Sequence, residues 1–169
     1  MRIFWIKTDG PGRLGITPRP DGGDDLETEI IDWRDDGVDV VVSMLETAEA
    51  EALGLAREAE LCARHGIIFA NVPVRDHDIP VDLPHYREVA QALASRMAAG
   101  EKIVIHCRAA LGRAPSLAAC VLIERGMSAG RALEIVGKAR KHRVPETDAQ
   151  TAFVWAYGSG QLFDAALSA

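Results

Sequence analysis

Cysteine is scarce in this chain, and the spacing of the few present excludes two common uses. The 169 residues contain three cysteines, Cys62, Cys107 and Cys120, an odd number without the close pairing of zinc ligands. A disulfide scaffold or a structural zinc site would need more cysteines at regular spacing. We therefore expect reduced thiols and a cytoplasmic protein.

Long apolar runs and an excess of positive charge are also missing. No segment approaches the roughly 20 apolar residues of a membrane span. The apolar run at 3–6 is too short for a signal peptide, because the charged Lys7 and Asp9 follow at once. Acidic residues outnumber lysine and arginine by 25 to 19, whereas a nucleic-acid surface requires a basic face. We expect neither a membrane nor a nucleic acid as partner.

The composition is that of a folded globular protein, with 48% hydrophobic and 26% charged residues. The length fits one domain, and no internal repeat or linker divides residues 1–169. Short apolar runs alternate with longer helical patterns, which predicts an α/β fold. Strands are expected at Arg2–Lys7, Arg13–Thr17, Val38–Met44, Ile67–Val72 and Lys102–His106.

Helical patterns occupy most of the intervals between these strands. Asp24 is a predicted N-cap with Glu27 three residues on, opening a helix that ends near Asp36. The stretch Glu46–His65 is rich in helix formers and is interrupted at Gly54. The remaining helices are expected at Leu83–Ala99, Ala114–Arg125, Ser128–His142 and Thr147–Leu167.

The stretch IHCRAALGRAPS, residues 105–116, carries the strongest functional signal. A strand would deliver Cys107 to its carboxyl end, where ligands bind in α/β sheets. The small residues that follow let successive backbone N–H groups point inward as an anion nest, and the next helix adds its positive N-terminal end. Such surroundings lower the pKa of a thiol, so we expect Cys107 to be a thiolate nucleophile. Arg113 would hold two phosphate oxygens through its planar guanidinium group.

Each of these residues also has a structural interpretation. A cysteine after an apolar strand is usually a small buried hydrophobe, and Arg113 taken alone could lie on a helix surface. Their combination after one buried strand and before one helix favours the phosphate-binding interpretation. Cys62 and Cys120 lie on apolar helical faces and are predicted to belong to the core.

The loop HCRAALGR resembles the H-C-x5-R signature of the protein tyrosine phosphatase superfamily, and the chain's size resembles its compact dual-specificity branch. Residues 41–80 are similar to the region through the general-acid loop of bacterial dual-specificity phosphatases and kinase-associated phosphatase. ETDAQTAFV, at 146–154, is similar to the start of their C-terminal helix. The resemblance implies a central, mixed, mostly parallel sheet flanked by helices, and hydrolysis of phosphomonoesters without a metal or other cofactor.

The resemblance also implies roles for individual residues. Cys107 would be the nucleophile, Arg113 the phosphate clamp, Asp76 the general acid and His106 a support that orders the loop. The substrate would be phosphotyrosine, with some phosphoserine or phosphothreonine, in a protein or a small phosphomonoester. The phosphate would lie against the backbone of Arg108, Ala109, Ala110, Leu111 and Gly112.

Two positions depart from the family pattern. Ala110 stands where glycine is usual, and a left-handed backbone there would cost about 1–2 kcal/mol. Ala114 stands where a serine or threonine usually stabilises the departing thiolate, and Ser116 is an unproven substitute. We expect a working but slow loop, with a phosphate-binding pseudophosphatase as the alternative. A rhodanese-type sulfurtransferase fits the His106–Cys107 pair and the match around Asp76 less well.

Several neighbouring residues keep two interpretations. The acid is Asp76, Asp78 or neither, because carboxylates on polar loops are often turn formers. Gln150 could position a water, but a capping box with Thr147 explains it, and the basic run Arg140–Arg143 is predicted to be the last turn of a helix. Arg75, His77 and Arg108 are the candidates for contacts with the substrate.

Overall fold

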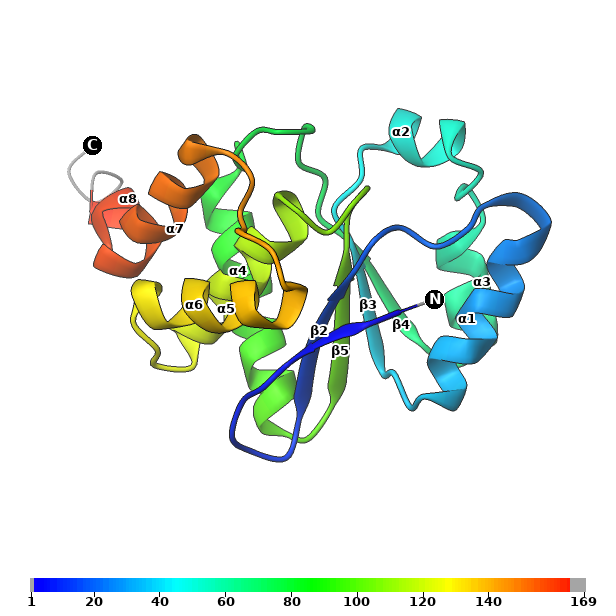
Figure 1. Ribbon diagram of the computed structural model, residues 1–169. Helices are drawn as coiled ribbons and strands as arrows, with labels where there is room; N and C mark the ends of the chain where they lie inside the picture. Colours follow the sequence, from blue (N-terminus) through cyan, green and yellow to red (C-terminus); the bar gives the residue numbers. More distant parts are fainter. Residues whose placement is uncertain (1, 165–169) are drawn as a thin grey trace.

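A mixed five-stranded sheet forms the centre of the protein in the computed structural model, which describes residues 2–164. The strand order is β1–β2–β5–β3–β4, and all neighbours are parallel except β1 and β2 (Figure 1). This confirms the predicted α/β fold with a mixed, mostly parallel sheet. The strands are β1 (Phe4–Ile6), β2 (Arg13–Thr17), β3 (Val40–Ser43), β4 (Ile68–Asn71) and β5 (Lys102–His106).

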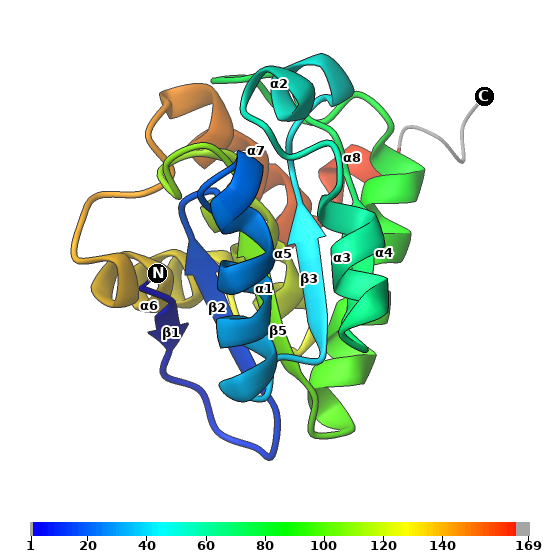
Figure 2. The same cartoon turned by 90° about the vertical axis from the view of Figure 1, so that its right-hand side faces the viewer.

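Helices cover both faces of the sheet. In Figure 2 the helices α1 and α3 lie in front of the strands, and α5 to α8 lie behind them. The short α2 lies beyond the carboxyl end of β3. The helices are α1 (Leu26–Asp35), α2 (Thr47–Ala52), α3 (Glu58–Arg64), α4 (Leu83–Ala98), α5 (Arg113–Glu124), α6 (Ala129–Arg140), α7 (Asp148–Ser159) and α8 (Gln161–Asp164).

Two apolar cores lie on the two faces because strand side chains alternate in direction. On the central strand β5, Ile103 and Ile105 pack into the core beneath α4 to α7. Val104, between them, packs into the smaller core beneath α1 and α3 with Trp33. A sheet buried on both faces leaves its strand ends as the place where polar chemistry can meet solvent.

Helix α5 is buried along nearly its whole length. Every residue from Arg113 to Leu122 is buried, and the helix packs between the sheet and the helices α4, α6 and α7. A charged side chain at its first position must therefore find partners inside the protein. This fixes the place and the surroundings of Arg113.

The predicted helix boundaries need two corrections and are confirmed at a third point. A 3-10 turn at Gly23–Asp25 precedes α1, so Asp25 rather than Asp24 is the residue before the helix, and no side chain caps it. The predicted break at Gly54, which has a φ of +74°, is confirmed and separates α2 from α3. The predicted final helix is two helices, because Gly160 adopts a φ of +79° after Ser159. Its last residues, from 165 on, lie outside the described part of the chain.

Within residues 2–164, no helix combines the length and the apolar character that crossing a membrane would require.

Candidate active site

The candidate nucleophile lies at the carboxyl end of the central strand, as the sequence predicts. Cys107 directly follows β5, and residues 107–112 connect that strand to α5 at the upper edge of the sheet in Figure 1. Cys107 is buried, and it lines a cavity of about 300 Å³ with Arg108, Ala109 and Leu111. The remaining lining residues are Asp76, His77 and Glu146.

The carbonyl groups of this loop point away from the cavity, where other segments bind them. The backbone N–H of Arg19 donates to the carbonyl of Arg108 at 3.3 Å. Arg140 donates from Nε to the carbonyl of Ala110 at 3.1 Å and from Nη2 to that of Ala109 at 3.3 Å. Each peptide is planar and trans, so an outward carbonyl turns the next N–H inward. The loop therefore has the arrangement of an anion-binding nest.

Two positions in the loop limit which residue can stand there, Ala110 through its backbone conformation and Gly112 through the space around it. Ala110 is fully buried and has a φ of 55°, in the left-handed region that glycine adopts more easily. The expected strain at this position is therefore present. A Cβ atom at Gly112 would lie 2.5 Å from Oε1 of Glu146 and 2.8 Å from the amide atoms of Gln150, so a larger residue there would displace the ends of these side chains.

Arg113 is held from one side by a carboxylate that sequence reasoning missed. Glu49, in α2, accepts from Nη1 at 2.7 Å and from Nη2 at 3.0 Å. The carbonyl of Val74 accepts a further bond from Nη1 at 3.0 Å. Burial alone would lower the pKa of Arg113, but the hydrogen bonds to Glu49 and the neighbouring negative groups raise it above its usual value. The guanidinium is thus a fixed positive charge beside the loop.

The other edge of Arg113 faces Asp76. Oδ1 of Asp76 lies 2.9 Å from Nη2 of Arg113, while Nε of Arg113 is buried without a hydrogen-bond partner in the described residues. Nη2 and Nε together form the edge that binds two oxygens of a phosphate. A phosphate bound there would gain the free Nε and would displace Asp76 from Nη2.

The structure separates the two candidate acids. Asp76 lines the cavity with Cys107, and 38% of its side chain is exposed. Asp78 does not line that cavity, and its carboxylate accepts a bond from the backbone of Ile79. The geometry therefore favours Asp76 of the two.

His106 contacts a buried carboxylate behind the loop. Nε2 of His106 lies 2.9 Å from Oε1 of Glu58, and both residues are at most 2% exposed. The contact is too poorly aligned to be a hydrogen bond, and neither ring nitrogen has another hydrogen-bond partner in residues 2–164. Glu58, in α3, thus places a buried carboxylate against the histidine that precedes the candidate nucleophile.

Ser116 is already engaged. Its hydroxyl donates to the carbonyl of Gly112 at 2.9 Å. The hydrogen is therefore not available to a departing thiolate in this arrangement. Ala114 itself is fully buried, and its methyl group offers no hydroxyl to the thiolate.

A family model described as a polymorphic toxin system DSP-PTPase phosphatase matches residues 19–127. The chain belongs to this family. It is a dual-specificity phosphatase domain of the protein tyrosine phosphatase superfamily, as the loop signature indicated. Among curated proteins, no sequence matches the chain.

Solved structures show the same fold at low sequence identity. Kinase-associated phosphatase with its catalytic-site cysteine replaced by serine superposes with a TM-score of 0.85, at 19% identity over 96% of each chain. PTPMT1 in complex with PI(5)P gives 0.71, at 19% identity over 96% of this chain and 99% of its own. Human DUSP28 gives 0.65, at 17% identity over 94% and 95%. These likenesses establish the phosphatase fold.

The other two cysteines of this phosphatase domain belong to the core, as predicted. Cys62 and Cys120 are fully buried. Burial raises the pKa of the Cys62 thiol to about 12, and it raises that of Cys120 further. Neither is a thiolate near neutral pH, so Cys107 is left as the candidate nucleophile of the fold.

Gln150 has the structural role that the sequence favoured. It forms the predicted capping box with Thr147 at the start of α7. Its Nε2 also donates to the carbonyl of Asp78 at 3.1 Å, which ties α7 to the loop of the candidate acid.

Of the three residues predicted to contact the substrate, His77 and Arg108 line the cavity of Cys107, whereas Arg75 does not.

One group of side chains in the cavity lining has the composition of a metal site. Asp76, His77 and Glu146 bring three ligand-type atoms within 4.8 Å of one another. Nδ1 of His77 lies 3.6 Å from Oε1 of Glu146, and both residues contribute to the charge of the cavity. The absence of a cofactor remains a prediction of the family resemblance.

Proposed function

We propose that this chain is a cysteine-dependent phosphatase that hydrolyses phosphomonoesters through a cysteinyl-phosphate intermediate. The observation that carries the proposal is the position of Cys107 in a cavity beside inward N–H groups, with the positive charge of Arg113 near enough to interact with its thiol. Both features suit a phosphate dianion, whose charge they would stabilise during transfer to the thiolate.

The reaction has two displacement steps. The Cys107 thiolate attacks phosphorus, the ester bond breaks, and Asp76 protonates the leaving oxygen. Water then attacks the cysteinyl phosphate, Asp76 takes a proton from it, and the sulfur–phosphorus bond breaks. Arg113 holds the phosphoryl oxygens throughout, and Glu49 keeps the guanidinium in place.

The cavity suits a substrate with a single phosphate. Its lining contains two carboxylates, Asp76 and Glu146, against the cations Arg108 and, when protonated, His77. Such a surface tolerates one phosphate in the nest but opposes further phosphate groups, so a polyphosphorylated lipid is a poorer fit. The proposed substrates are phosphotyrosine and, in addition, phosphoserine or phosphothreonine. The proposed location is the cytoplasm.

A binding protein without appreciable turnover is the second candidate. Two observations favour it: Ser116 does not replace the hydroxyl missing at Ala114, and Asp76 occupies the phosphate-binding edge of Arg113. Such a pseudophosphatase would bind a phosphomonoester in the nest without hydrolysing it. The retained Cys107 and Arg113 favour the enzyme.

Turnover of p-nitrophenyl phosphate by the wild type and by Cys107→Ser tests the assignment. We expect the substitution to reduce kcat more than about 10³-fold, because the thiolate performs the chemistry. Inorganic phosphate should still bind the variant, measured by calorimetry, since the nest is unchanged. Activity of Cys107→Ser within tenfold of the wild type would refute the nucleophile. A wild type that binds phosphate without any turnover would establish the pseudophosphatase.

A further inference from the structure

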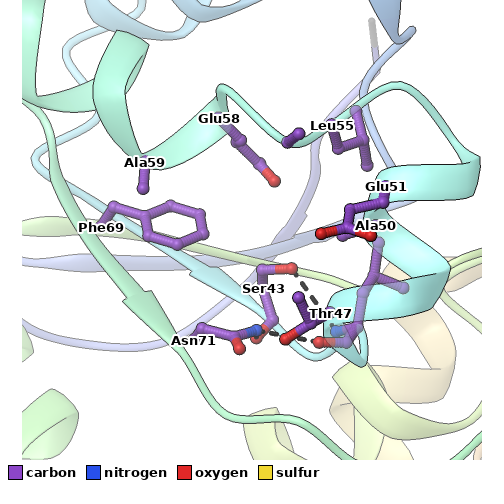
Figure 3. Close-up of a pocket in the computed structure, with 11 residues that line it drawn as sticks. Ser43, Thr47, Ala50, Glu51, Leu55, Glu58, Ala59, Phe69 and Asn71 are labelled. Carbon is purple, nitrogen blue, oxygen red and sulfur yellow. Dashed lines mark hydrogen bonds between the residues drawn. The ribbon is translucent and has the colours of Figure 1, made fainter.

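A second cavity lies between α2, α3 and the ends of β3 and β4 (Figure 3). Ser43 and Asn71, the last residues of β3 and β4, place it at the same edge of the sheet as the phosphate loop. It shares no lining residue with the cavity of Cys107. Its volume is about 220 Å³, below the ~300–1,000 Å³ usual for drug-sized ligands, so an occupant must be small.

The charge of this second cavity is negative. Glu51 and Glu58 line it, and no lysine, arginine or histidine does. In the described part of the chain, Glu51 has no ion-pair partner. Figure 3 shows the carboxylate of Glu58 directed from α3 into the space above Ser43. A buried carboxylate that faces a cavity favours a cationic occupant.

The hydrogen-bonding groups of the cavity also select the ligand. Both amide hydrogens of Asn71 are used, because Nδ2 donates to the carbonyls of Ser43 and Leu45 at 3.0 Å each. The carboxylates of Glu51 and Glu58 can only accept hydrogen bonds when ionised. The hydroxyls of Ser43 and Thr47 also line the cavity, but a ligand that pairs with the two carboxylates must itself bring donors, as an ammonium or amidinium group does.

Apart from Ser43 and Thr47, the remaining wall is apolar. Phe69 presents its ring beside Glu58 in Figure 3, and Leu45 and Leu55 add aliphatic surface. An aromatic face close to a carboxylate binds a cation through both its quadrupole and its area. The ligand should therefore carry one compact apolar group next to its charge.

We propose that this second cavity binds a small organic cation, a primary ammonium or amidinium with one compact apolar group, and that Glu58 is its counter-ion. Glu58 is also the residue that lies 2.9 Å from His106, whose neighbour is Cys107. A ligand that takes the Glu58 carboxylate removes the charge facing His106. The site is therefore connected to the phosphate loop through one buried contact.

Titration with benzylamine, followed by NMR of the isotope-labelled protein, tests the binding. Amide signals of α2, α3 and the end of β4 should shift saturably, and the ring nitrogens of His106 should shift with them. Benzyl alcohol has the same shape without the charge and should bind at least tenfold more weakly. This measurement does not depend on catalysis, so it can fail while the phosphatase assignment holds.

Three variants make the assignment specific. Glu58→Gln should weaken benzylamine binding at least tenfold, while Glu88→Gln, which removes an exposed acid on α4, should leave it unchanged. Because Glu58 is buried and its substitution can destabilise the fold, Ala59→Leu provides a second test. Ala59 is an exposed lining residue, so the larger side chain fills the cavity without disturbing the core, and binding should be lost.

Equal binding of benzylamine and benzyl alcohol would overturn the proposal. So would equal binding to the wild type and Ala59→Leu, or shifts confined to another surface of the protein. Binding in α2 and α3 without any response of His106 would refute the proposed connection to the phosphate loop.

Discussion

The two loops that carry the proposed nucleophile and acid are held in different ways. Residues 107–112 follow the central strand, and three of their carbonyls accept bonds from Arg19 and Arg140. The loop of Asp76 follows the edge strand β4 and is largely exposed, with Val81 at 96% exposure. It contacts Arg113, at the end of the phosphate loop, through the ion pair of Asp76 and through the carbonyl of Val74, which accepts from Nη1.

This difference assigns the loops different tasks. The phosphate loop is built before substrate arrives, as electrostatic stabilisation of a transition state requires. The acid instead lies where a phosphate oxygen would bind, so substrate must displace its carboxylate from Nη2 of Arg113. In the proposed reaction, the displaced Asp76 would stay beside the phosphate and give its proton to the leaving oxygen. A rigid anion site and a movable acid follow from the contacts of the two loops.

Asp76→Asn tests the movable loop and should have the largest effect on the rate of ester cleavage. An alkyl phosphate should be cleaved ~10²–10⁴-fold more slowly, because its poor leaving group needs a proton. p-Nitrophenyl phosphate, whose leaving group is good, should be slowed far less. Asp78→Asn is the matched control, since its carboxylate lies outside the cavity. Equal losses for both substrates in Asp76→Asn would assign that residue a structural role.

Arg113→Lys tests the rigid anion site. Lysine keeps the charge but loses the paired N–H groups, which are worth about 1.5–3 kcal/mol each toward a charged partner. We expect on the order of 10²-fold loss in both phosphate affinity and kcat/KM. Circular dichroism of the variant monitors the fold, because the contacts with Glu49 are lost as well. Unchanged phosphate affinity in a folded variant would contradict the clamp.

Arg140→Met should have the smallest effect, since it leaves every proposed catalytic group in place. Its two bonds to the loop carbonyls are worth about 0.5–1.5 kcal/mol each, so phosphate affinity should fall several-fold to about tenfold. Arg143→Met is the control, because within residues 2–164 the guanidinium of Arg143 contacts only the exposed Asp148. An equal change in the two variants would show that Arg140 does not order the loop.

The sequence predicted the parts of the site that are local in the chain. The strand, loop and helix around Cys107 follow from an apolar run, small residues and a proline-containing first turn. The left-handed conformation of Ala110 follows from a family pattern with glycine at that position. Local order of this kind leaves a signal in consecutive residues.

The partners from distant segments could not be predicted. Glu49 and Glu58 lie in helices rich in glutamate, where nothing distinguishes them from solvated neighbours. Arg140 matched the basic last turn of a helix, and its bonds to residues thirty positions earlier depend on how α6 packs. Only the packing of helices against the sheet brings these charges to the site.

The central claim is that Cys107 accepts a phosphoryl group from the substrate and later releases it to water. Ala114 slows the release because it lacks a hydroxyl. Rapid mixing of the wild type with p-nitrophenyl phosphate tests it most directly. A burst of nitrophenol approaching one equivalent per enzyme should precede slow turnover, and Ala114→Ser should speed the slow phase and reduce the burst. Failure to release nitrophenol even in a single turnover would contradict the claim and leave the loop as a phosphate-binding site.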